Sequence, residues 1–194
     1  EADFIDAGAG ADSVRAIRGG DDTIEAGAGP DWVDAGAGRD FVRGGAGWDV
    51  LFGGDGDDAV DGGDDEDRVN GMAGDDVLRG GGASDLIGGG AGRDVIYAGA
   101  GDDFVAAGSN VQPSPIDPPP GATLAARGQD WGVHVVRATN GRVLTYVFNW
   151  SEVDGDADDD IAYGETGNDL LLGGRGSDLL DGGADDDDLV GEEG

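Results

Sequence analysis

The chain has 194 residues, of which 38% are hydrophobic, 42 are glycine and none is cysteine. Lys and Arg number 11 against 43 Asp and Glu, which gives a formal net charge of -32 at pH 7. This charge argues against nucleic acid as a partner, and the absence of cysteine excludes disulfides and thiolate metal sites. No apolar run is long enough to span a membrane, and residues 1–30 lack the pattern of a signal peptide. Such a composition is typical of disordered chains unless the sequence contains other evidence of order.

That order is a nine-residue repeat, clearest in GGAGWDVLF, GGDGDDAVD, GGDDEDRVN, GMAGDDVLR, GGGASDLIG and GGAGRDVIY over residues 44–97. The first block slips once, by one extra residue near Ala16, where we expect a bulge. The sixth position of every repeat is aspartate: Asp3, Asp12, Asp22, Asp31, Asp40, Asp49, Asp58, Asp67, Asp76, Asp85, Asp94, Asp103, Asp160, Asp169, Asp178 and Asp187.

The eighth position of each repeat is apolar, and only Ala162 is small there. Glycine-rich positions 1 to 6 favour a turn, because glycine tolerates positive φ and leaves room for backbone carbonyls to approach an ion. Positions 7 to 9 predict a three-residue strand. Because side chains alternate along a strand, position 8 faces a thin interior and positions 7 and 9 face outward.

The pattern G-G-x-G-x-D-x-U-x, with U apolar, resembles the haemolysin-type calcium-binding repeats of the repeats-in-toxin (RTX) family. The resemblance covers residues 1–106 and 155–194, with departures such as Ala26, Met72, Asp65 and Ala83 at glycine positions. It implies an all-β, right-handed parallel β-roll in which two repeats form one coil, so that odd and even repeats form two sheets. It also implies calcium ions between successive coils, held by the position-6 carboxylates and by turn carbonyls.

All-oxygen ligation of this kind suits Ca²⁺ better than Mg²⁺ or Zn²⁺, and about a dozen dications would offset most of the charge. Without calcium the acidic turns repel one another and the thin core cannot hold them together. We therefore expect folding coupled to the binding of several structural Ca²⁺ ions.

We expect three segments: a β-roll of twelve repeats over 1–106, a Pro-rich linker with a β-hairpin over 107–153, and a second β-roll block of four repeats over 154–194. In the insert, QPSPIDPPPG favours an extended linker. The runs around Asn140-Gly141 predict a hairpin with a two-residue turn, pairing Val133 with Phe148 and Trp131 with Trp150. This hairpin either packs on the side of the roll or uses Trp131, Tyr146 and Trp150 to bind a glycan or partner.

The junction DGDADDDIAYGE, residues 154–165, also resembles an EF-hand calcium loop. Its flanks do not predict helices, and Asp159 stands where that loop needs glycine, so the nonapeptide frame is preferred. Asp154, Asp156 and Asp158 exceed what this frame requires and could supply an extra calcium site. The single histidine, His134, is interpreted as a strand residue of the hairpin.

Position 7 carries apolar side chains where a freely soluble roll would carry polar ones. β-propensity alone is one explanation, and a contact surface is the other. The candidate contact residues on the roll are Phe4, Trp32, Phe41 and Phe104. The sequence begins in mid-repeat and stops four positions into another, from which we expect a fragment of a longer protein or a unit that stacks end to end.

The sequence contains no metalloprotease, nucleophile-elbow or phosphate-loop motif, so we do not expect an enzyme. The favoured function is a calcium-binding structural module of an extracellular or cell-surface assembly, with self-association or packing on another domain. The alternative, which the resemblance also implies, is a C-terminal calcium-triggered folding or secretion domain of a secreted enzyme or toxin. A catalytic motif encoded upstream of residue 1 in the parent gene would favour the accessory domain of an enzyme over the structural module.

Overall fold

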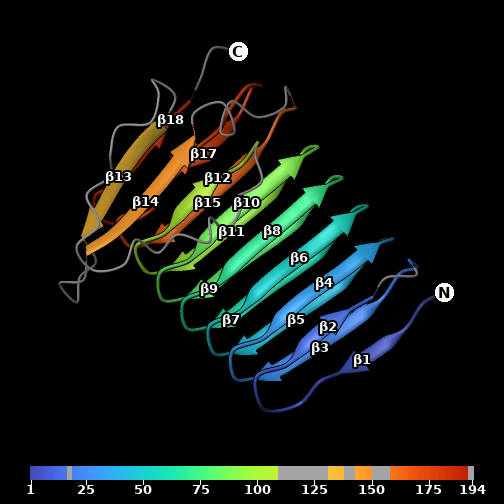
Figure 1. Ribbon diagram of the computed structural model, residues 1–194. Helices are drawn as coiled ribbons and strands as arrows, with labels where there is room; N and C mark the ends of the chain where they lie inside the picture. Colours follow the sequence, from blue (N-terminus) through green and yellow to red (C-terminus); the bar gives the residue numbers. More distant parts are fainter. Residues whose placement is uncertain (17–18, 109–130, 138–142, 150–157, 192–194) are drawn as a thin grey trace.

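The computed structural model describes residues 1–16, 19–108, 131–137, 143–149 and 158–191, and within these ranges it contains strands and no helix (Figure 1). Successive strands alternate between two eight-stranded parallel sheets. The first sheet consists, in spatial order, of β1 (Phe4–Asp6), β3 (Thr23–Ala28), β5 (Phe41–Ala46), β7 (Ala59–Asp64), β9 (Val77–Gly82), β11 (Val95–Ala100), β15 (Ile161–Thr166) and β17 (Leu179–Asp181). The second consists, in reverse spatial order, of β2 (Ser13–Arg15), β4 (Trp32–Ala37), β6 (Val50–Asp55), β8 (Arg68–Ala73), β10 (Leu86–Ala91), β12 (Phe104–Ala106), β16 (Leu170–Leu172) and β18 (Asp188–Val190).

Neighbouring strands of a sheet are related by two repeats. Val42 pairs with Ile24 on one side and with Val60 on the other, each eighteen residues away. Each coil therefore contains one strand of each sheet and two nonapeptides, and Figure 1 shows the coils stacked along one axis. The predicted all-β parallel β-roll and the division of odd and even repeats between two sheets are confirmed.

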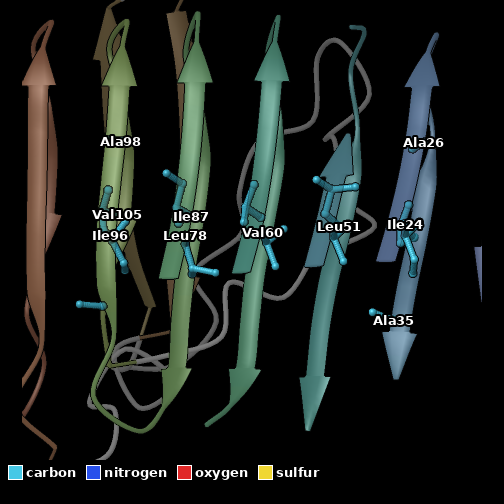
Figure 2. Packing of buried hydrophobic residues seen from close by; sticks show 14 of the residues in the cluster. Ile24, Ala26, Ala35, Leu51, Val60, Leu78, Ile87, Ile96, Ala98 and Val105 are labelled. Carbon is cyan, nitrogen blue, oxygen red and sulfur yellow. The ribbon is translucent and has the colours of Figure 1, made fainter. Parts of the chain in front are cut away.

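The core is one side chain thick and consists mainly of position-8 residues. Ile24, Leu51, Leu78, Ile87 and Ile96 are fully buried between the two sheets (Figure 2). Burial alternates along most strands, as expected when successive side chains point to opposite faces. The interior is therefore a thin layer of apolar side chains along the roll, to which both sheets contribute.

The strands are longer than predicted. Most of them have six residues and continue through positions 1 to 3 of the following repeat, instead of ending at position 9. These positions pair across coils, as Gly45 does with Gly27 and Gly63. Gly45 has φ of 113°, and a Cβ there would lie 2.0 Å from the carbonyl oxygen of Gly27. Glycine at this position thus lets the strands continue without a steric clash between coils.

The extra residue of the first block lies where the sequence indicates. Arg15 pairs with Asp34, nineteen residues later in the sequence, whereas Thr23 pairs with Phe41, eighteen residues later. The change occurs between Ala16 and Gly20, a segment that includes two residues outside the described ranges.

The two blocks of repeats form one continuous roll. β11 pairs with β15 and β12 with β16, although 66 residues separate Val95 from its partner Ile161. The Pro-rich segment, the Asn140-Gly141 turn and residues 154–157 lie outside the described ranges.

The hairpin itself is confirmed, with β13 (Trp131–Arg137) antiparallel to β14 (Val143–Asn149), but the predicted register is wrong by one residue. Trp131 pairs with Asn149 and His134 with Tyr146, and five residues separate the last pair, Arg137 and Val143. A one-residue shift exchanges the two faces of the hairpin, so positions 131 and 146 do not share a face in this register. Binding of a glycan or partner by the hairpin stays a prediction. Trp150 lies outside the described residues.

The outward apolar row is exposed on one sheet only. Phe4, Phe41, Val77 and Leu179, all of the first sheet, have exposed fractions of 72%, 38%, 39% and 53%. On the second sheet Phe104 and Leu170, with Ala106 and Leu172, form a separate buried cluster, and Trp32 is half-buried. Phe104 is 2% exposed. Its predicted role as a contact residue, with the hairpin insert or with a partner, stays a prediction.

None of the described segments forms a helix able to cross a membrane.

Candidate metal centre

The position-6 aspartates form two ladders that run along the roll. In each step the backbone N–H of one aspartate donates to Oδ1 of the position-6 aspartate one coil later, as in Asp49 to Asp67 at 2.8 Å and Asp67 to Asp85 at 2.8 Å. The ladders cross the insert, where Asp94 N–H donates to Asp160 Oδ1 at 2.8 Å and Asp103 N–H to Asp169 Oδ1 at 2.9 Å. All sixteen predicted aspartates take part in these ladders as donor, acceptor or both.

The second oxygen of these carboxylates is buried and accepts no hydrogen bond. This holds for Oδ2 of Asp12, Asp31, Asp40, Asp49, Asp58, Asp67, Asp76, Asp85, Asp103 and Asp169. A buried carboxylate oxygen without a donor is costly unless a cation or a proton compensates it. The ladders therefore present a regular series of oxygens that lack a positive partner among the described residues.

In the repeats that begin with glycine, these oxygens lie beside that first glycine. A Cβ added to Gly62 would stand 2.6 Å from Asp67 Oδ2 and 2.5 Å from the carbonyl oxygen of Gly80. Equivalent distances at Gly44 are 2.5 Å to Asp49 Oδ2 and 2.5 Å to the carbonyl oxygen of Gly62. A carboxylate oxygen and a carbonyl oxygen of the next coil thus converge on a space that stays open only because position 1 has no side chain.

Burial raises the pKa values of the carboxyl groups in Asp40, Asp49, Asp58, Asp67, Asp76, Asp85, Asp103 and Asp169. The pKa rises from 3.8 to about 6 in Asp49, about 7 in Asp58 and about 9 in Asp85. Desolvation is the largest cause, and the negative charge of a neighbouring position-6 aspartate, such as Asp103 beside Asp85, raises the pKa further. The backbone N–H bond to Oδ1 opposes the shift but does not cancel it. Without a cation, several of these groups would be protonated near neutral pH.

The donors of the centre are oxygens from both side chains and backbone. No cluster of three or more His, Cys, Asp or Glu side chains suited to a metal occurs among the described residues, so carboxylates alone do not form a site there. We call each repeat with its position-6 aspartate a rung of the roll. The rungs at the two ends are more open, because Asp3 is exposed and Asp12, Asp178 and Asp187 are half-buried. For the proposed extra site, Asp158 is exposed, and Asp154 and Asp156 lie outside the described residues.

A second ladder, which the sequence reasoning missed, connects position-5 residues. Asp75 N–H donates to Asp57 Oδ1 at 3.1 Å, and Arg93 N–H donates to Asp75 Oδ1 at 3.1 Å. Here the later coil donates to the earlier one, opposite to the position-6 ladder. The sequence contains a signal for this ladder, because side chains that can accept a hydrogen bond recur at position 5, in Asp57, Asp75, Asp102 and Asn168.

Comparison with protein families matches the chain to the RTX calcium-binding nonapeptide repeat over residues 1–16, 18–51, 43–78, 61–94, 79–110 and 154–189. The chain belongs to the RTX calcium-binding repeat family. No curated protein sequence matched it. The RTX matches stop at residue 110 and resume at 154, so the family pattern is interrupted by the same insert that interrupts the roll.

The residues of this RTX roll fit calcium. Hard oxygen donors, a buried oxygen that lacks a donor, and a glycine-lined space beside it are the chemistry that Ca²⁺ requires. The position-6 aspartates and the backbone carbonyls of position 1 are the groups that would hold the ions. Bound Ca²⁺ would supply the positive charge that the buried carboxylates need.

Proposed function

We propose that this chain is a calcium-dependent structural module of an extracellular or cell-surface assembly, and that it folds as calcium binds. The observation that carries this proposal is the series of buried Oδ2 atoms without a donor, in a chain whose net charge is -32. Burying these carboxylates in the ionised state opposes folding, and bound calcium reverses the sign of that contribution.

An extracellular location would provide calcium at the concentration that such structural sites require. Extracellular calcium modules work at about 10⁻⁴ to 10⁻³ M Ca²⁺, whereas regulatory sensors respond at far lower concentrations. Many weak structural sites of this kind suit the higher range.

The exposed apolar side chains of the first sheet support the assembly role. Phe4, Phe41, Val77 and Leu179 project from strands of one sheet, and their counterparts on the second sheet are largely covered. Exposed apolar surface on a regular sheet is typical of a contact with another protein surface.

Far-UV circular dichroism with calcium and with a chelator tests the calcium-dependent folding. We expect a disordered spectrum in chelator and a β spectrum after calcium is restored, and a chain equally folded in both would refute the proposal. Sedimentation velocity in millimolar calcium tests the assembly. Oligomers that weaken in a Phe41→Ser variant support it, whereas monomers alone would favour the accessory-domain alternative.

A further inference from the structure

Position 1 of the repeat differs between two groups of rungs. It is glycine throughout residues 44–97 and again from Gly164 onward, whereas it is alanine at Ala26, Ala35 and Ala98. These three alanines are completely buried and belong to the apolar core, where Figure 2 labels them beside Ile24 and Ile96. Their methyl groups therefore point to the inside of the roll, on the side of the position-6 aspartates.

In rungs with glycine at position 1, the carboxylate Oδ2 and the carbonyl oxygen of the next coil converge on the space that this methyl group would occupy. The point where a Cβ would stand lies 2.4 Å from Asp85 Oδ2 at Gly80 and 2.2 Å from Asp169 Oδ2 at Gly164. Real methyl groups do not approach an oxygen so closely, so an alanine rung must hold its carboxylate and the facing carbonyl further apart. Calcium binds oxygens at about 2.3 to 2.6 Å, so a methyl group in this space competes directly with an ion.

Charge follows this division only in part, because residues 80–97, which also have glycine at position 1, contain two acidic residues and one basic residue. Residues 7–43, where the alanine rungs of the first block lie, contain seven acidic and four basic residues. Residues 44–79, which have glycine at every position 1, contain eleven acidic and two basic residues. In the alanine segment, arginines already pair with carboxylates, as Arg15 does with Asp34 at 2.9 Å and Arg43 with Glu25 at 3.3 Å. Asp31 and Asp40 of the alanine rungs keep a buried Oδ2 that accepts no hydrogen bond, so these rungs also present an oxygen to a cation, and the methyl group beside it reduces the space for one.

We propose that the residue at position 1 sorts the rungs by calcium affinity: glycine rungs bind calcium more tightly than alanine rungs, where a buried methyl group occupies space beside the carboxylate. This inference rests on the proposed calcium-dependent function and refines it. In the rungs of residues 26–43, apolar contacts and arginine pairs then contribute relatively more to the packing of the coils, and in the rungs of residues 44–97 bound ions contribute more.

Reciprocal substitutions test the inference in the full chain. Gly62→Ala places a methyl group beside Asp67 Oδ2 and the carbonyl oxygen of Gly80, which must move apart, and it adds no backbone strain because Gly62 does not have positive φ. Gly82→Ala is the matched control: Gly82 also lacks positive φ, and its Cβ would lie 3.9 Å from the nearest atom outside its immediate neighbours. Ala35→Gly removes a methyl group from an alanine rung. Bound calcium is counted by equilibrium dialysis with metal analysis, and affinities are measured by calorimetry.

We expect Gly62→Ala to lose roughly one or two ions per chain, or to weaken them about tenfold or more, while Gly82→Ala matches the parent chain. Ala35→Gly should gain an ion or bind an existing one more tightly. Unchanged stoichiometry and affinity in both Gly62→Ala and Ala35→Gly would overturn the inference, while calcium binding by the parent chain would leave the proposed function intact. If Gly62→Ala does not fold, Ala35→Gly decides alone, with a gain in support and no change against. A parent chain that binds no calcium would refute both proposals.

Discussion

Replacing Asp85 with asparagine separates the effect of a buried charge from the effect of a calcium ligand. Asp85 is completely buried, its Oδ1 accepts the N–H of Asp67 at 2.8 Å, and its Oδ2 accepts no hydrogen bond. Burial, together with the charge of Asp103, raises its pKa from 3.8 to about 9. At neutral pH the metal-free folded chain must therefore keep Asp85 protonated, whereas the unfolded chain has it ionised.

The magnitude follows from the interval between the ordinary pKa and neutral pH. Holding a group of pKa 3.8 protonated at pH 7 costs about 4 kcal/mol, because each pKa unit corresponds to about 1.4 kcal/mol. The pKa of Asp85 is higher in the folded chain than in the unfolded chain, so its protonation stabilises the folded chain. This stabilisation is fully present below pH 3.8 and is lost as the pH rises toward about 9. Asparagine is neutral at every pH, keeps an oxygen to accept the Asp67 N–H, and removes the cost.

The assay has two readouts. Circular dichroism in chelator, followed between about pH 3 and pH 9, reports metal-free folding, and equilibrium dialysis counts bound calcium. We expect Asp85→Asn to stay folded in chelator to a higher pH than the parent chain and to bind roughly one or two fewer ions. Asp61→Asn is the control, because Asp61 lies at position 9 with its side chain 36% exposed. A metal-free folding profile identical to that of the parent chain, or an unchanged calcium count, would refute the reasoning.

Three further predictions follow from single residues. Asp76→Ala should weaken calcium binding more than Asp61→Ala, because Asp76 is 1% exposed and its Oδ2 accepts no hydrogen bond; equal calorimetric midpoints would contradict the register. Asp65→Gly should stabilise the calcium-bound chain by about 1 kcal/mol in urea denaturation, because Asp65 occupies a glycine position with φ of 76°; no gain would show that this backbone is unstrained. Leu51→Ala should cost about 2 to 5 kcal/mol in the same assay, since Leu51 is fully buried. Val77→Ala, on the exposed outer face, should reduce stability less, and equal losses of stability would argue against a core that consists mainly of position-8 side chains.

Much of the fold could be predicted because a solenoid makes nearly all its contacts between successive coils. The nine-residue period fixed which residues share a sheet, as Val42 and Val60 do, and which face the interior. It also predicted the alignment of the position-6 aspartates, whose equal spacing brings Asp49 and Asp67 together without any knowledge of the rest of the chain. A local repeat is enough when every neighbour in space is a repeat at a fixed distance in sequence.

The tertiary structure decided what the repeat does not encode. Strands extend to six residues because glycine backbones pair across coils, and the hairpin register differs by one residue from the register that the Asn-Gly signal predicts. Phe104 is buried in a cluster with Leu170 on the second sheet, and the period alone does not predict that burial. The sequence by itself determined where the carboxylates lie. Only the packed coils decided that, in aspartates such as Asp67 and Asp85, one oxygen accepts a backbone N–H and the other is buried beside position 1, because that arrangement depends on the direction in which each side chain crosses to the next coil.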